Sequence, residues 1–333
     1  MKLRIFVFLL SLLSGPAQAA EPGGRAITLP SLFTETFLDI REDVRDAARS
    51  GKRLMLFFQQ DGCPYCKELV QTNFSQKSIA DKVRKDFVAI AINIWGDREL
   101  TWVDGTTMSE KKFAEFLKIQ FTPTLLFLDE QGRVVARLNG YYPPHRFDAV
   151  LDYVAGRMEN RVSLADHLKS AAKEPASAGL HDEPFFLKPP YDLRRRGPKP
   201  LAVLFETRYC GACDELHREG FRRKEVRALL TRFDIARFAL SDRTGIVTPD
   251  GLRMPAEEWA RVLQIAYTPS VVFFDAGGRE VFRIEAYLRP FHLAASLDYV
   301  ASEAYLREPS FQRFIQSRAR SMRGRGEAVD LWR

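Results

Sequence analysis

Cysteine is scarce in this chain of 333 residues, which contains only four. They stand in two close pairs, Cys63 with Cys66 and Cys210 with Cys213, so none is left over for a long-range disulfide. A disulfide that closes so short a loop removes little entropy from the unfolded chain and stabilises a fold poorly. The two pairs therefore indicate chemistry rather than structural cross-linking.

Long apolar runs are lacking beyond the first 20 residues, so no later segment is expected to cross a membrane. At the start, Lys2 and Arg4 precede an apolar stretch at 5–13, and small residues follow at 17–19. This layout is typical of a cleavable secretory signal. We expect residues 1–19 to be a signal peptide and the protein to be periplasmic or secreted, with an uncleaved membrane anchor as the alternative.

Metal-ligand patterns and nucleic-acid-binding patterns are also missing. Four of the five histidines show no ligand spacing, and His217, one turn after Cys213, is expected to be a solvated helix residue. Two Cys-x-x-Cys pairs could form a zinc site, but 143 residues separate Cys66 from Cys210, which disfavours it. The net charge is +7, but the basic residues are not interleaved with aromatic residues as they are on a nucleic-acid-binding surface. We expect no metal, no cofactor and no nucleic acid.

The chain contains two copies of one sequence unit, an internal repeat. When 104–155 is aligned with 250–301, 22 of the 52 positions are identical. Upstream, an offset of 147 residues superimposes the two cysteine pairs. A period of this length corresponds to a domain rather than to a solenoid repeat.

The repeat and the composition divide the chain into parts. After the signal peptide we expect a first domain at 25–173, a proline-rich linker at 174–198 and a second domain at 199–320. A basic tail is expected at 321–333, which we interpret as the solvated face and frayed end of a helix. The linker is expected to lie partly over a domain through its aromatic residues, and each domain is expected to end in an extra helix.

Each unit has the pattern of an α/β domain. In the first unit, apolar runs at 53–59, 87–94, 124–128 and 133–139 predict strands. Helices are expected after Cys63, at 110–118 and around 147–154, where apolar residues follow the helical template. The order β-α-(α)-β-α-β-β-α predicts a mixed central sheet flanked by helices.

The leading cysteine of each pair stands where a strand ends and a helix begins. The positive end of a helix dipole and its free backbone N–H groups stabilise a thiolate over a thiol. We therefore expect Cys63 and Cys210 to be the exposed nucleophiles that attack a disulfide. Cys66 and Cys213, one turn inside, are expected to resolve the mixed disulfide.

These residues resemble a known family. Cys-Pro-Tyr-Cys at 63–66 with Thr122-Pro123, and Cys-Gly-Ala-Cys at 210–213 with Thr268-Pro269, resemble the thioredoxin superfamily. The fuller pattern looks like the secreted thioredoxin-related proteins of bacterial sulfur oxidation and like the terminal domain of the transmembrane thiol reductase. By this resemblance both prolines are cis, and both threonines offer backbone groups to a bound peptide.

The resemblance implies a periplasmic thiol–disulfide oxidoreductase that reduces protein disulfides and is fed by a membrane thiol donor. The redox direction rests on the resemblance alone, so an oxidase or an isomerase stays open. A tandem binding scaffold with one or both cysteine pairs idle is a further alternative. One departure concerns the buried aspartate of thioredoxin, whose positions hold Phe57 and Leu204, so that proton acceptor is missing.

Overall fold

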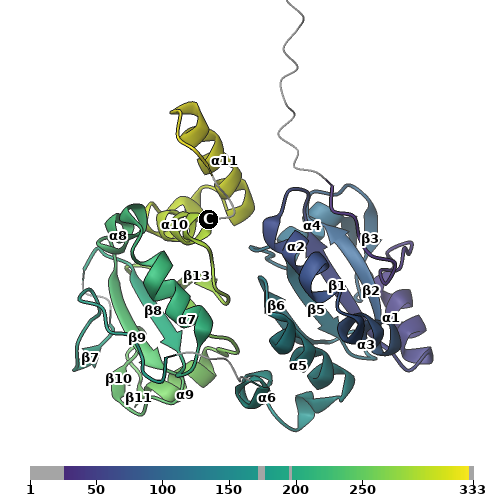
Figure 1. Cartoon of the computed structure of the whole chain (residues 1–333), viewed down its shortest axis with the longest axis horizontal. Helices are drawn as coiled ribbons and strands as arrows, with labels where there is room; N and C mark the ends of the chain where they lie inside the picture. Colours follow the sequence, from purple (N-terminus) through teal and green to yellow (C-terminus); the bar gives the residue numbers. More distant parts are fainter. Residues whose placement is uncertain (1–25, 172–176, 195–196, 330–333) are drawn as a thin grey trace, which may run out of the picture.

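The computed structural model describes residues 26–171, 177–194 and 197–329, and it contains two domains of like architecture (Figure 1). The expected signal peptide at 1–19 lies outside these residues. Within the described ranges, no helix is both long and apolar enough to cross a membrane.

A four-stranded mixed sheet forms the centre of the first domain. Its order is β2-β1-β5-β6, in which β1 pairs in parallel with β2 and antiparallel with β5. The strands are β1 (Arg53–Gln59), β2 (Phe87–Asn93), β5 (Thr124–Leu128) and β6 (Val134–Asn139). The predicted mixed sheet is confirmed. The two central strands are apolar on both faces because helices cover both.

Helices surround this sheet on its two faces. Those that pack on one face are α2 (Pro64–Glu68), α3 (Lys77–Asp86), α5 (Pro144–Ala155) and α6 (Leu164–Ala171). Those on the other face are α1 (Ile40–Arg49) and α4 (Glu110–Phe116). The π-helical turn η1 (Leu69–Asn73) prolongs α2, the 3-10 turn η2 (Met158–Asn160) precedes α6, and a small hairpin joins β3 (Glu99–Thr101) to β4 (Thr107–Ser109).

The second domain repeats this plan. Its sheet has the order β13-β12-β8-β9, formed by β8 (Leu201–Glu206), β9 (Asp234–Ala239), β12 (Ser270–Phe274) and β13 (Glu280–Ile284). Its helices are α7 (Gly211–Glu215), α8 (Lys224–Leu230), α9 (Ala256–Val262), α10 (Pro290–Ala301) and α11 (Phe311–Gly324). The turns η3 (Leu216–Gly220) and η4 (Ala304–Leu306) follow α7 and α10, and β10 (Gly245–Val247) pairs with β11 (Arg253–Pro255).

The segment between the domains lies over the second one, as its aromatic residues predict. Phe186 is buried in the second core, and the short strand β7 (Tyr191–Asp192) pairs in parallel with β10. The extra helices expected at the ends of the two units are α6 and α11. The second continues to Gly324, past position 320, where we placed the boundary between domain and tail.

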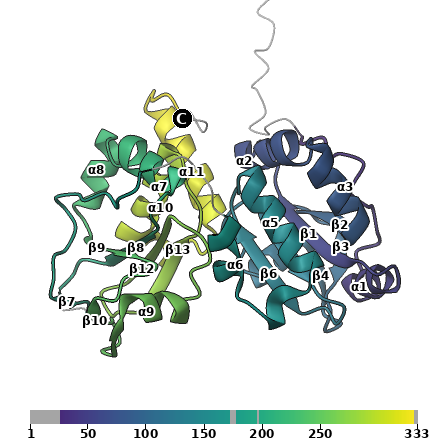
Figure 2. The ribbon, with the colours of Figure 1, turned by 60° about the horizontal axis from the view of Figure 1, so that its bottom comes forward.

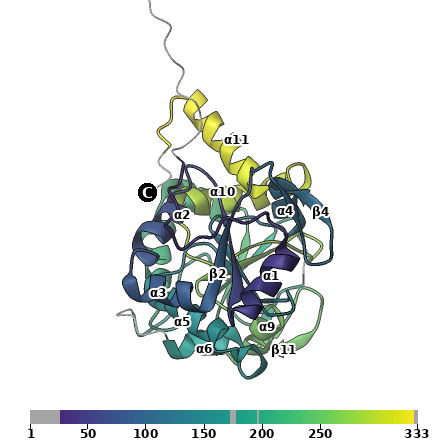
Figure 3. The same cartoon turned by 90° about the vertical axis from the view of Figure 1, so that its right-hand side faces the viewer.

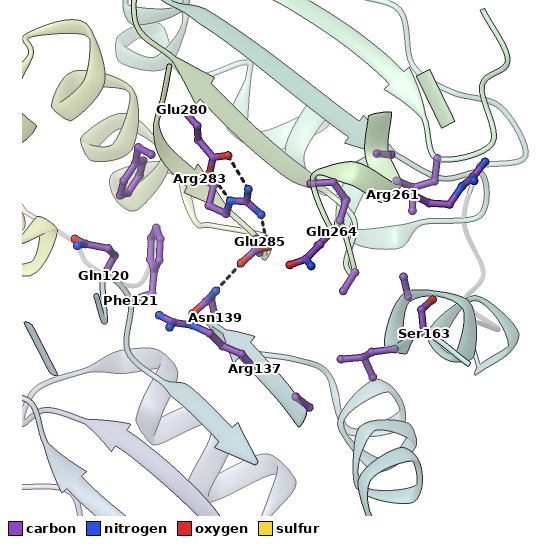
Figure 4. Close-up of a pocket in the computed structure, with 18 of the residues that line it drawn as sticks. Gln120, Phe121, Arg137, Asn139, Ser163, Arg261, Gln264, Glu280, Arg283 and Glu285 are labelled. Atoms are coloured by element: carbon purple, nitrogen blue, oxygen red, sulfur yellow. Dashed lines mark hydrogen bonds and ion pairs between the residues drawn. The ribbon is translucent and has the colours of Figure 1, made fainter. Parts of the chain in front are cut away.

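The domains meet through equivalent positions of the repeat. The side chain of Asn139, at the end of edge strand β6, donates a hydrogen bond to Glu285, which stands 146 residues later just after edge strand β13 (Figure 4). Beside this contact the edge strands line a cleft of about 1330 Å³. Figure 2 shows α11, in yellow, along the boundary between the domains.

Candidate active site

The first cysteine pair lies where β1 ends and α2 begins. Cys63 is the N-cap of α2, and its sulfur accepts a hydrogen bond from the Cys66 amide at 3.0 Å. Pro64 lies in the first turn of α2, where backbone N–H groups have no partner within the helix. The N–H that proline lacks therefore costs this helix no hydrogen bond. Once reduced, Cys63 therefore has a backbone donor and the positive end of a helix to stabilise a thiolate.

The Thr122-Pro123 loop lies directly against this sulfur. The Cys63 Sγ is 3.3 Å from the carbonyl oxygen of Thr122, and the Thr122–Pro123 peptide bond is cis. The Gln60 side chain donates a hydrogen bond to the Thr122 hydroxyl at 3.0 Å, which joins the loop to the end of β1. Residues 59 positions apart in sequence thus form one site.

The second pair has the same geometry. Cys210 is the N-cap of α7, and its sulfur accepts a hydrogen bond from the Cys213 amide at 3.1 Å. The Cys210 Sγ lies 3.6 Å from the carbonyl oxygen of Thr268, and the Thr268–Pro269 bond is cis. The structure therefore brings together all eight site residues that the sequence suggests, four in each domain.

Both pairs are oxidised to disulfides and both are buried. The exposed fractions are 5% for Cys63, 0% for Cys66, 2% for Cys210 and 3% for Cys213. The expectation that the leading cysteine is exposed is therefore wrong for the oxidised protein. Each leading sulfur is covered by its Thr-Pro loop, which the linear sequence places far away.

The prediction for His217 is wrong. This side chain is 1% exposed and lies between two carboxylates, at 3.1 Å from Glu183 and 3.0 Å from Glu206. Burial lowers its pKa, but the hydrogen bonds that the ring donates to Glu206 and then to Glu183 outweigh this effect and raise the pKa above its usual value. The prediction failed because Glu183 belongs to the linker, which folds against the helix that carries His217.

Glu206 is a residue that the sequence reasoning missed. It ends strand β8, is 1% exposed, and one of its carboxylate oxygens has no hydrogen-bond partner among the described residues. It stands two positions after Leu204, at the place where the first domain has Gln59. A carboxylate at the end of the otherwise apolar run Leu201–Phe205, next to the Cys-x-x-Cys turn, was the available signal.

A second acid–histidine pair lies beside the cluster formed by His217, Glu183 and Glu206. His181 contacts Asp214 at 2.6 Å, and its ring stacks on that of His217 at 4.5 Å. Burial raises the pKa of Asp214, but hydrogen bonds from Ser177 and His181 lower it overall. Within the described part of the chain, no group of three or more histidine, cysteine or acidic residues is arranged to hold a metal ion.

Fold and site together define a class of protein, the thioredoxin-like thiol–disulfide oxidoreductases. The sequence model of the thioredoxin-like domain family matches residues 40–155 and 193–301, more than half of the chain. The chain therefore belongs to the thioredoxin-like domain family, with one copy of the domain in each half.

Parts of this chain are similar to individual proteins and solved structures. It is 30% identical over 109 residues to the thiol:disulfide interchange protein DsbD of Photorhabdus laumondii subsp. laumondii, a match that covers 32% of this chain and 17% of that protein. A thioredoxin-fold protein from Helicobacter pylori is 24% identical, with a TM-score of 0.32 and coverage of 40% of this chain and 90% of that one. The DsbD C-terminal domain of Neisseria meningitidis is 18% identical, with a TM-score of 0.28 and coverage of 37% and 97%.

Proposed function

We propose that this protein is a periplasmic enzyme that reduces protein disulfides by dithiol exchange at both Cys-x-x-Cys sites. One observation carries the proposal: in each domain a cysteine sulfur caps a helix and lies within 3.6 Å of the carbonyl oxygen before the Thr-Pro proline. A scaffold has no need of a pre-organised sulfur in either half. The extracytoplasmic location is supported by the pattern of residues 1–19, and the name of the DsbD relative fits the activity.

The exchange proceeds in two steps. The Cys63 thiolate attacks one sulfur of the substrate disulfide, which breaks that bond, forms a mixed disulfide and releases a substrate thiolate that takes up a proton. Cys66, after losing its proton, attacks Cys63, which closes the internal disulfide and releases the second substrate thiol. Two electrons pass from the dithiol to the substrate. Cys210 and Cys213 act in the same way.

The direction requires a donor of thiols. Each turnover leaves the pair oxidised, so a reduced dithiol must restore it, and we assign this role to a membrane thiol donor. A reduction potential of about −270 mV, typical of thioredoxin-like reductants, is the expected value for a reductase, whereas about −120 mV is typical of a strong oxidant. Redox titration of each pair, with the other replaced by serine, measures it.

A trapping experiment tests the assignment of the nucleophiles. Cys66→Ser leaves Cys63 able to attack and unable to be released, so this variant accumulates mixed disulfides visible on non-reducing gels. Cys63→Ser removes the attacking sulfur and accumulates none. The same contrast is expected for Cys213→Ser and Cys210→Ser. Equal trapping by both variants of a pair overturns the order of attack, and a lack of turnover at both sites in wild type favours the scaffold.

A further inference from the structure

The cysteine site of the first domain opens into a cavity that the second domain helps to form. This cavity has a volume of about 330 Å³, at the small end of the roughly 300–1,000 Å³ typical of ligand pockets. Cys63, Thr122 and Tyr141 line it on one side, and His292, Gln312 and Ile315 line it on the other. Figure 3 shows α2, α10 and α11 gathered at one end of the molecule.

Specific hydrogen bonds hold α11 over the site. The Gln312 side chain accepts a hydrogen bond from Gln60 at 2.6 Å and donates one to the Gln120 carbonyl at 2.8 Å. The Phe311 amide donates to the Gln120 side chain at 2.9 Å. Gln60 also holds the Thr122 hydroxyl, so the start of α11 is tied to both the strand and the loop that position Cys63.

A second contact fixes α10 against the cysteine turn itself. The Tyr65 hydroxyl, between the two cysteines, accepts a hydrogen bond from the Arg289 amide at 2.9 Å, and the Tyr65 ring packs on His292 at 5.1 Å. Burial raises the pKa of Tyr65 to about 12, so this hydroxyl stays neutral. A bulky folded surface cannot approach Cys63 from this side without displacing the second domain.

The mouth of the cavity is basic. Arg320 and Arg323, both on α11 and both exposed, line it, and neither has an ion-pair partner among the described residues. Asp61 is the one carboxylate among the described lining residues. Two cations beside one anion, close to the attacking sulfur, favour a negatively charged substrate.

We infer that the first domain acts on a disulfide carried by an extended, acidic polypeptide segment, with α10 and α11 of the second domain forming half of the substrate groove. The inference rests on the proposed reductase activity and adds the substrate class for one site. The narrow cavity selects an extended segment, and Arg320 and Arg323 select acidic residues that flank its cysteines. The electrons follow the two-step exchange already described: the segment's disulfide is reduced as Cys63 and Cys66 are oxidised.

The experiment uses the full chain with Cys210→Ser and Cys213→Ser, so that only the first site turns over. Three synthetic peptides that share one internal disulfide, flanked by glutamate, glutamine or lysine, are reduced under steady-state conditions. Dithiothreitol re-reduces Cys63 and Cys66 after each turnover, and the rate without protein is subtracted. The glutamate peptide is expected to have a KM about tenfold below that of the glutamine peptide, and the lysine peptide a higher one still. Raising the salt concentration should narrow these differences because it screens exposed charges.

Charge reversal provides the decisive comparison. Arg320→Glu with Arg323→Glu is expected to raise the KM for the glutamate peptide about tenfold and to change the KM for the glutamine peptide far less. The control, Lys224→Glu with Arg227→Glu, makes the same change in net charge on exposed residues of α8 that do not line the cavity. An equal effect of both double variants, or no effect of either, overturns the inference.

Three further outcomes are distinguishable. If oxidised glutathione, a small anionic disulfide, responds to Arg320→Glu with Arg323→Glu while the glutamate peptide does not, the site takes a small molecule and the polypeptide assignment is wrong. If the reduced protein fails to reduce any of these probes and also a generic aromatic disulfide reagent, the proposed reductase activity itself fails. Reduction of all probes without charge preference overturns the substrate class alone.

Discussion

At the scale of single residues, the largest departure from expectation is the buried cluster behind the second cysteine pair. His217 lies between Glu183 and Glu206, and the aromatic rings of Phe186 and Phe221 lie at 6.0 and 5.0 Å from its ring. Arg222 reaches Glu183 at 3.5 Å from the solvent side. Charges in such apolar surroundings persist only when they are paired.

Replacing His217 should therefore be costly. His217→Leu leaves Glu183 and Glu206 buried without their central donor, and loss of one partner from a buried ionic cluster costs about 3–5 kcal/mol. Urea unfolding at pH 6 measures this loss in the free energy of unfolding. His217→Gln keeps a donor in its side-chain NH2 group but loses the charge, so it should fall between wild type and His217→Leu. A loss below about 1 kcal/mol for His217→Leu contradicts the ion-pair assignment.

The same residue predicts a pH dependence. Folding raises the pKa of His217 above its ordinary value of 6.5, so its charge stabilises the folded protein fully below about pH 6.5. This contribution is lost as the pH rises through the higher pKa of the folded state. The stability difference between wild type and His217→Gln should therefore shrink from pH 6 to pH 9. A difference that is constant over this range shows that His217 does not titrate there.

At the scale of helices and strands, the local sequence pattern predicted the positions of strands and helix starts. The strands at 53–59 and 124–128 are β1 and β5, because uninterrupted apolar runs suit central strands covered on both faces. The position of Cys63 at a helix start followed from the strand–turn–helix pattern. The approach of Thr122 to Cys63 was expected from the family resemblance alone. The folding of Glu183 onto His217 and the placement of α11 also join distant segments. No single-chain periodicity encodes such contacts, so they could not be read from it.

The loop that follows β6 illustrates how such a contact constrains one position. Gly140 has a φ of +98°, and a Cβ placed there would lie 2.8 Å from the Cβ of Ala286, which occupies the equivalent position of the second domain. A side chain at 140 therefore strains the backbone and pushes the domains apart.

A pair of substitutions separates these two effects. Gly140→Ala should lower the free energy of unfolding by about 1–3 kcal/mol, from the strained φ and the overpacked contact. Gly140→Ala combined with Ala286→Gly removes the clash and leaves the φ strain, so it should recover part of the loss. Thermal unfolding of the two single variants and the double variant measures the coupling. If the losses simply add, position 140 does not contact Ala286 in solution.

At the scale of the whole molecule, each domain supports the other's Thr-Pro loop. Phe121, just before Thr122, packs against Phe282 at 5.5 Å and Phe311 at 5.2 Å in the second domain. Tyr267, just before Thr268, packs on Tyr142 of the first domain at 4.3 Å. The aromatic residue that precedes Thr122 or Thr268 is therefore held across the interface, so the Thr-Pro loop of each domain depends on contacts with the other domain.

This reciprocity predicts that a change in one domain alters the site of the other. Tyr142→Leu installs the residue that the second domain has at the equivalent position, Leu288, so the first core keeps an apolar side chain of suitable size. It removes an aromatic pair worth about 0.5–1.5 kcal/mol beyond its buried area. With Cys63→Ser and Cys66→Ser in the background, kcat/KM at the second site should fall about 2- to 12-fold, the same free energy expressed as a rate.

The first site serves as the internal reference for this effect. With Cys210→Ser and Cys213→Ser instead, Tyr142→Leu should leave kcat/KM at the first site within about twofold, because Phe121 keeps its own partners in the second domain. Tyr142→Phe retains the ring pair and should leave both sites at wild-type rates. Equal losses at both sites would mean that Tyr142 contributes general stability, whereas a loss confined to the second site shows that the first domain positions the Thr268-Pro269 loop.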